Sequence, residues 1–266
     1  MENTTVHYFT LITGASSGIG KALAIECAKR GMNLLMVSLP ESGLPALSDE
    51  ISKTHNVIVK YLEINLDREN AHREVLNYIH DKNLNINILI NNVGVGHNGY
   101  LENIPEEKVT EMLMLNMRIT TLLIQVLIHE LKKSGNAYIL NVGSLAAFTP
   151  LPGKSVYAAS KAYVLYLTMA IHQELKSSGI SVSGIFPAGV PTNPAVQNRI
   201  KNSGLFAKQM VLSPEEVARY AISGLLKKKE IIIPGRNSKT VFFLGKFLPH
   251  VLLMKIMARE FFRAPN

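Results

Sequence analysis

The sequence predicts an α/β fold in which one doubly wound parallel sheet of seven strands carries helices on both faces. Short apolar runs alternate with longer helical segments along the chain, and this alternation implies parallel strands joined by right-handed crossovers. The short runs are continuous in Val, Ile and Leu, as expected of strands that helices cover on both sides. No linker, internal repeat or low-complexity segment divides these elements, so a single domain is expected.

Each predicted strand is a short apolar run, followed by a segment long enough to return over the sheet. The first strand precedes a glycine-rich turn, and the helix after that turn ends at Gly31. Strands are expected at residues 7–13, 33–38, 57–64, 87–92, 136–144, 180–187 and 230–234. Helices are expected at residues 18–31, 44–54, 68–81, 106–132, 155–177 and 214–228. The sheet therefore needs residues 1–235, and residues 236–266 form a helical extension.

Positive charge is concentrated at the C-terminal end of the chain. Residues 227–266 hold nine Lys or Arg and two acids, a net +7 of the formal +8. The rest of the chain is nearly neutral and has no zinc-finger or aromatic–basic motif, so nucleic acid binding is not expected. The single cysteine, Cys27, excludes an internal disulfide and fits a cytoplasmic protein, and no His/Cys cluster has metal-ligand spacing. The N-terminal residues do not resemble a signal peptide.

A glycine-rich turn joins the first strand to the first helix. Gly14, Gly18 and Gly20 let the backbone turn tightly and approach a pyrophosphate, whose charge the helix N-terminus receives. Such turns also close helix–strand packing without a ligand, but strand, turn and helix occur here in the required order. We therefore expect a Rossmann-type dinucleotide site.

Two motifs resemble those of the short-chain dehydrogenase/reductase family. The segment 13–20 has the family's Thr-Gly-x-x-x-Gly-x-Gly spacing, and residues 91–94 resemble its Asn-Asn-Ala-Gly motif, with Val93 in place of Ala. The resemblance runs from about residue 8 to residue 234 and implies an NAD(P)(H) cofactor. The cofactor contacts it implies are Gly14, Ser16, Ser17, Gly18, Ile19, Gly20, Ser38, Asn65, Leu66, Asn92, Val93, Gly94, Tyr157, Lys161, Pro187, Gly189, Val190 and Thr192.

The predicted chemistry lies with Tyr157 and Lys161, which share a helix face because they are four residues apart. Hydride transfer to a carbonyl leaves an alkoxide that needs a proton. A Tyr hydroxyl can supply it, although its usual pKa of about 10 suits neutral pH poorly. A cationic Lys one helical turn away favours the phenolate and so lowers that pKa.

The family resemblance completes the catalytic set. It adds Ser144, thirteen residues before Tyr157, as the donor to the substrate oxygen, and Asn116 as the holder of a proton-relay water. It also implies that Lys161 binds the nicotinamide ribose. Taken singly, these residues are more often a turn residue, a packing polar group or helix surface, but their joint positions favour catalysis.

The end of the second strand bears on the choice of cofactor. An acid there would bind the adenosine ribose and repel a 2′-phosphate, whereas an Arg would attract the phosphate. The chain has Ser38-Leu39-Pro40 instead, and Asn65 stands where the family often has Asp. Because two acids are absent but the expected Arg is absent too, NADP(H) is slightly favoured and NAD(H) stays open.

The expected substrate is a hydrophobic carbonyl or alcohol, such as a steroid or a fatty chain. Residues 191–212 would form a lid over it, unless their apolar side chains only pack the lid itself. The expected substrate contacts are Ser144, Leu145, Tyr157, Leu205 and Phe206. A hydroxysteroid dehydrogenase-like enzyme is the first expectation, and a 3-oxoacyl-thioester reductase is the second. A non-catalytic dinucleotide-sensing protein is the third, against which the intact catalytic set argues.

The C-terminal extension has two open interpretations. Charged residues and a proline interrupt its apolar runs, so a membrane-spanning helix is not expected. A helix beginning at Pro249 would carry apolar residues on one side and basic residues on the other, as in peripheral contact with anionic lipid. The apolar side could instead pack on its own domain or across a dimer. The family resemblance implies a homodimer or homotetramer formed through the helices at 106–132 and 155–177.

Overall fold

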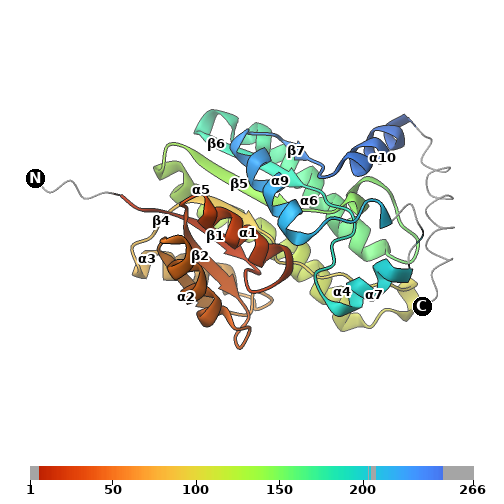
Figure 1. Ribbon diagram of the computed structural model, residues 1–266, viewed down its shortest axis with the longest axis horizontal. Coiled ribbons are helices and arrows are strands. Elements are labelled where there is room, and N and C mark those ends of the chain that lie inside the picture. Colours follow the sequence, from red (N-terminus) through yellow and green to blue (C-terminus); the bar gives the residue numbers. More distant parts are fainter. Residues whose placement is uncertain (1–5, 203, 205–207, 248–266) are drawn as a thin grey trace, which may run out of the picture.

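A computed structural model describes residues 6–202, 204 and 208–247 of the chain (Figure 1). In these residues one parallel sheet of seven strands has the order β3-β2-β1-β4-β5-β6-β7, which confirms the predicted class. The strands are β1 (Tyr8–Thr13), β2 (Asn33–Ser38), β3 (Val59–Glu63), β4 (Asn85–Asn91), β5 (Ala137–Val142), β6 (Ile180–Ile185) and β7 (Ile231–Ile232).

Helices cover both faces of the sheet. One face packs against α1 (Gly18–Lys29), α2 (Leu44–His55) and α9 (Pro214–Leu226). The other packs against α3 (Ala71–Asp81), α5 (Ile119–Lys133) and α6 (Ser155–Glu174). Successive strand residues serve opposite faces, so on β1 Ile12 belongs to the first core cluster and Leu11 to the second. This burial on both faces of the sheet explains why the apolar runs in the sequence are continuous.

The helix expected over residues 106–132 is divided into three pieces. α4 (Glu106–Leu113) is followed by a π-helical turn, η2 (Met114–Arg118), and then by α5. Such turns recur at functional sites because they displace one side chain from the helical register. By length and composition alone Glu106–Lys133 could cross a membrane, but its residues Leu123 and Leu127 are fully buried in the core of this domain.

Two helices lie toward the C-terminal end of the chain. α7 (Pro194–Asn202) lies within the expected lid, where no helix was predicted, and α10 (Arg236–Phe247) begins the extension that was predicted to be helical. Figure 1 shows both at one end of the molecule, with α2 and α3 toward the other. The helix expected to begin at Pro249 lies outside the described residues. The described residues also include three single 3₁₀ turns: η1 (Leu101–Asn103), η3 (Leu145–Phe148) and η4 (Lys176–Ser178).

The strand order determines where a ligand can bind. The chain proceeds from β1 toward β3 on one side and from β4 toward β7 on the other, so β1 and β4 are neighbours where the order reverses. Loops leaving the carboxyl ends of such neighbours diverge and leave a crevice between them. Thr13 ends β1 and Asn91 ends β4, and both belong to the motifs predicted to bind a cofactor.

Candidate active site

The turn between β1 and α1 forms a backbone cradle at the carboxyl edge of the sheet. Gly14 and Gly18 have φ angles of +65° and +52°, a left-handed conformation that residues with a Cβ rarely adopt. A Cβ on Gly20 would lie 1.9 Å from the Gly14 carbonyl oxygen, so only glycine lets α1 begin this close to the turn. The Ser17 side chain makes no capping hydrogen bond, and the first turn of α1 holds no acid. The N-terminus of α1 therefore suits the pyrophosphate of a dinucleotide.

Asn92 and Thr13 hold this cradle against the end of β4. The Asn92 side-chain amide donates to the carbonyls of Thr13 at 2.9 Å and of Gly14 at 3.2 Å. The Thr13 hydroxyl accepts from the backbone N–H groups of Asn92 at 3.0 Å and of Val93 at 3.1 Å. The two predicted cofactor motifs are therefore joined directly by hydrogen bonds.

The residues predicted at the adenosine end lie at the ends of β2 and β3. The Ser16 and Ser38 hydroxyl oxygens are 2.7 Å apart, so neutral groups stand where the family's acid would be. The Asn65 side-chain oxygen accepts from the backbone N–H of Asp67 at 2.9 Å and closes its own turn. The Leu66 side chain is buried in the core, which leaves its backbone as the part able to reach a cofactor.

Asn116 lies in the π-helical turn η2 and is 1% exposed. Its side-chain oxygen accepts from the Val95 N–H at 2.9 Å, and its amide donates to the Val95 carbonyl and the Ser160 hydroxyl, both at 2.9 Å. Both amide hydrogens are thus in use, which leaves the oxygen as the side-chain atom able to hold a water. A Cβ on Gly94 would lie 2.7 Å from Asn116 Oδ1 and 3.2 Å from Lys161 Nζ, so glycine is needed beside them.

Lys161 is buried on α6, with 6% of its surface exposed. Its ammonium donates to the Val142 carbonyl oxygen at 3.1 Å and lies 5.9 Å from the centre of the Tyr157 ring. Burial disfavours the cation and lowers the pKa of Lys161 from 10.5 to about 8. An ammonium has three hydrogens, so the bond to Val142 leaves capacity for the hydroxyl of Tyr157 or of a ribose.

Ser144 lies two residues after the end of β5 and caps η3. Its hydroxyl oxygen accepts from the backbone N–H two residues later at 3.2 Å, which leaves the hydroxyl hydrogen for a substrate oxygen. The next residue, Leu145, donates its N–H to the Pro187 carbonyl at 2.9 Å. Tyr157 lies in the first turn of α6, which packs on η3, and its ring borders Gly96. Three of the predicted substrate residues thus share this edge of the sheet, whereas Leu205 and Phe206 lie outside the described residues.

The segment after β6 closes over the glycine turn. The Cβ and methyl of Thr192 lie 3.0 Å from the place that a Cβ on Gly18 would take. The Gly189 carbonyl accepts from the Leu212 N–H at 3.3 Å, and the Val190 side chain is buried in the core. The cofactor contacts predicted after β6 and the predicted pyrophosphate turn are therefore in direct contact.

Two groups at this site were missed by the sequence predictions. The Ser160 hydroxyl is buried between two predicted residues, since it accepts from Asn116 and donates to the Tyr157 carbonyl at 2.8 Å. The sequence does offer a sign of this role, because Ser160 is a polar residue directly before Lys161. The Val142 contribution is a backbone carbonyl, which no side-chain pattern can reveal.

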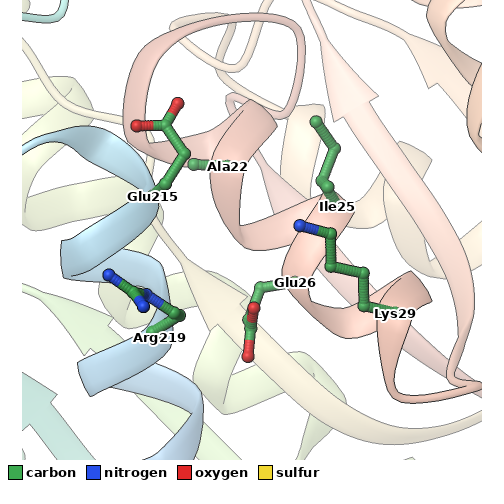
Figure 2. A pocket seen from close by; sticks show the side chains of 6 residues that line it. All are labelled: Ala22, Ile25, Glu26, Lys29, Glu215 and Arg219. Carbon is green, nitrogen blue, oxygen red and sulfur yellow. The ribbon is translucent and has the colours of Figure 1, made fainter.

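A separate cavity of about 220 Å³ lies between α1 and α9 (Figure 2). It is lined by Ala22, Ile25, Glu26, Lys29, Glu215 and Arg219. The charges of its two acids and two bases cancel, and none of the predicted catalytic residues lines it. We therefore place the chemistry at the carboxyl ends of the strands. Among the described residues no group of three His, Cys, Asp or Glu could hold a metal ion.

Comparison with curated proteins identifies relatives across most of the chain. The short chain dehydrogenase family matches residues 9–203. Hydroxysteroid dehydrogenase-like protein 1 of Gallus gallus is 31% identical over 245 residues, which are 91% of this chain and 72% of that protein. The human protein named inactive hydroxysteroid dehydrogenase-like protein 1 is 28% identical over 92% of this chain and 73% of its own. The very-long-chain 3-oxoacyl-CoA reductase of Bos taurus is 28% identical over 70% of this chain, and the match spans 61% of that protein.

Solved structures share the fold. A short-chain dehydrogenase from Sphingobium yanoikuyae in complex with NADPH superposes with a TM-score of 0.78 at 29% identity, covering 92% of this chain and 95% of that one. The bulky-bulky ketone specific alcohol dehydrogenase of Comamonas testosteroni gives 0.76 at 28% identity, covering 94% and 95%. Fold and similarity together place the chain among oxidoreductases that bind NAD(P)(H). The chain belongs to the short chain dehydrogenase family.

Proposed function

We propose that this protein interconverts a carbonyl and a secondary alcohol on a hydrophobic substrate, in the manner of a hydroxysteroid dehydrogenase. The observation that carries the proposal is the burial of Lys161 beside Tyr157, with Asn116 linked to the same helix. A Tyr/Lys pair on an ordinary helix surface would leave the ammonium in water, because burying a cation costs free energy. A cation whose pKa is perturbed in this way is a mark of functional sites.

The chain's own residues supply proton transfer, charge stabilisation and positioning. NAD(P)(H), when bound, supplies or accepts the hydride. In the reducing direction the Ser144 hydroxyl donates to the substrate oxygen, and the Tyr157 hydroxyl gives that oxygen its proton. Lys161, which is cationic below its pKa of about 8, stabilises the phenolate left behind. In the oxidising direction the same phenolate takes the proton back.

NADP(H) is the cofactor we propose as preferred. The hydroxyls of Ser16 and Ser38, 2.7 Å apart, can donate to a 2′-phosphate, and neither carries a charge that would repel it. The similar enzyme from Sphingobium yanoikuyae was solved with NADPH, which supports the same choice. The expected result is a higher kcat/KM with NADPH than with NADH.

The substrate class rests on relatives of two kinds. One group is named for hydroxysteroids and the other for very-long-chain 3-oxoacyl-CoA, and a similar solved enzyme is specific for bulky-bulky ketones. All three names describe a carbonyl or alcohol beside a large apolar group. A steroid-like ketone is our first proposal. A 3-oxoacyl thioester is the second, because the basic C-terminal residues complement the phosphates of coenzyme A.

A dinucleotide-sensing protein without turnover is the alternative of a different class. The relative whose name includes the word inactive motivates it. The presence in this chain of Asn116, Ser144, Tyr157 and Lys161 favours the enzyme, because a sensing protein has no need of a proton donor next to a buried cation.

Replacing Tyr157 by Phe tests the proposed function. The substitution removes only the hydroxyl, so NADPH binding, followed by fluorescence titration, should be retained. Turnover of a steroid ketone should fall by roughly 10²- to 10⁴-fold, the usual contribution of a general acid. Tyr166→Phe is the matched control, because Tyr166 is 71% exposed on the same helix and should keep wild-type rates.

Near-normal turnover by Tyr157→Phe would contradict the mechanism. Wild-type protein that binds NADPH yet reduces neither steroid ketones nor 3-oxoacyl thioesters would favour the sensing protein.

A further inference from the structure

We propose that α10 is a positioning element for the substrate site, and that Phe242 on this helix holds Ser144 in place through Phe148. The inference rests on the function proposed above, because it assigns Ser144 the task of binding the substrate oxygen. It adds a residue from outside the sheet domain to the determinants of substrate binding.

Three phenylalanines from three separate segments pack edge to face. The Phe148 ring centre lies 5.2 Å from that of Phe186 and 4.7 Å from that of Phe242, with interplanar angles of 65° and 70°. Phe186 is fully buried at the end of β6, so it is a rigid support. The Phe148 side chain therefore packs between the sheet and α10.

The position of Ser144 depends on this packing because η3 is a single 3₁₀ turn. Such turns have poor hydrogen-bond geometry and little stability of their own. One end of the turn is held by the Leu145 N–H, which donates to the Pro187 carbonyl at 2.9 Å. The other end is held by Phe148, its last residue. Without Phe242, one side of Phe148 would face water and the turn could rotate, which would displace the Ser144 hydroxyl.

The N-terminal part of α10 contacts the segment expected to cover the substrate. The Asn237 side-chain amide donates to the Gln209 carbonyl at 3.0 Å, within the segment expected to cover the substrate. Three residues further on, the Leu212 N–H donates to the carbonyl of Gly189, one of the predicted cofactor contacts. One helix thus contacts both the Ser144 turn and the end of the covering segment, and Figure 1 shows it at the same end of the molecule as α7.

Phe242→Ala against Phe243→Ala tests the proposal. The two substitutions remove the same side chain from adjacent positions on α10. Phe243 is 58% exposed, and its ring contacts Phe242 rather than Phe148. Removing the Phe243 ring therefore leaves the contact between Phe242 and Phe148 in place. Phe242→Ala should raise KM for a bulky ketone and lower kcat, together about 10²-fold in kcat/KM, the scale of a 1 Å misplacement. NADPH affinity should not change, and Phe243→Ala should behave as wild type.

Two further measurements separate positioning from general destabilisation. Phe242→Leu keeps an apolar side chain against Phe148 and should recover most of the activity. Adding Phe242→Ala to Phe148→Ala should cause little further loss, because both residues act through one contact. An equal, additive loss would overturn the proposed route through Phe148.

Amide hydrogen exchange gives a readout that needs no turnover. The Leu145 and Ala147 N–H groups, which are bonded within and around η3, should exchange faster in Phe242→Ala than in Phe243→Ala. Unchanged exchange overturns the positioning role even if no substrate is found. The wild type could prove inactive while Phe242→Ala still speeds amide exchange in η3. That result would refute the proposed function but support the contact of Phe242 with Phe148 as the one that holds η3.

Discussion

At the scale of one residue, the burial of Lys161 lowers the stability of the fold but suits the proposed chemistry. Its ammonium is removed from water and has the neutral Val142 carbonyl as its acceptor in the described structure. Among the described residues no carboxylate compensates the charge, and burial is the cause of its lowered pKa. A packed apolar side chain at this position would stabilise the fold more, but it could not stabilise a phenolate at Tyr157.

The lowered pKa of Lys161 predicts a pH-dependent stability of the cofactor-free protein. The folded state has a pKa of about 8 and the unfolded chain about 10.5, so the unfolded state binds more protons between these values. The free energy of unfolding should therefore rise with pH across this window, by about 3 kcal/mol at most from this group. Below pH 8 the burial cost is present in full.

Urea unfolding of wild type and Lys161→Met across this pH range measures the effect. The stability of the wild type relative to the variant should increase with pH, because Met has no charge to lose. The buried Cys27 thiol, whose pKa burial raises to about 12, acts in the opposite direction but equally in both proteins. A difference that stays constant with pH would mean that Lys161 remains charged in the fold.

At the scale of elements, the residues proposed to bind cofactor and substrate lie at the carboxyl ends of the strands. The β1–α1 turn requires Gly20 because backbone stands where its Cβ would be. The π-helical turn η2 carries Asn116 inward, where it links the loop after β4 to α6. Ser38 at the end of β2 differs from Gly20 and Asn116, because close packing of the backbone does not require serine at this position.

Ser38→Asp should shift the enzyme toward NADH. The new carboxylate could accept from the Ser16 hydroxyl and would repel a 2′-phosphate, so the ratio of kcat/KM for NADPH over NADH should fall by about tenfold or more. Ser38→Ala is the control, since it removes the same hydroxyl without adding charge. Equal ratios in the two variants would show that the charge at this strand end does not select the cofactor.

At the scale of the whole molecule, a nearly neutral domain is joined to a strongly basic C-terminal end. The described part of the extension packs on the domain through Phe242. The two roles expected for the helix from Pro249 concern residues outside the described ones. Peripheral binding to anionic lipid through residues 249–266, cytoplasmic location and assembly into a dimer or tetramer stay predictions. On α6, Tyr166 and Met169 are exposed apolar residues at the face where assembly was expected.

Flotation with anionic liposomes tests the lipid interaction. Reversing the charge of Lys255, Arg259 and Arg263 to Glu should abolish salt-sensitive flotation, because each basic residue near such a surface contributes about 1 kcal/mol. Reversing Lys227, Lys228 and Lys229, which are exposed after α9, changes the net charge equally and should have little effect. Flotation unchanged in the first variant would rule out lipid binding by these residues.

The amino-acid sequence was enough to predict the fold class, the seven strands, the glycine turn and the Tyr157/Lys161 pair. These are local properties, because strand burial and helical spacing follow from patterns among neighbouring residues. The three-dimensional structure was needed to find the acceptor for Lys161, the contacts of Ser160, the π-helical turn at Asn116 and the packing of Phe242 on Phe148. These depend on contacts between segments distant along the chain, some of them through backbone atoms, and side-chain periodicity carries no record of such contacts.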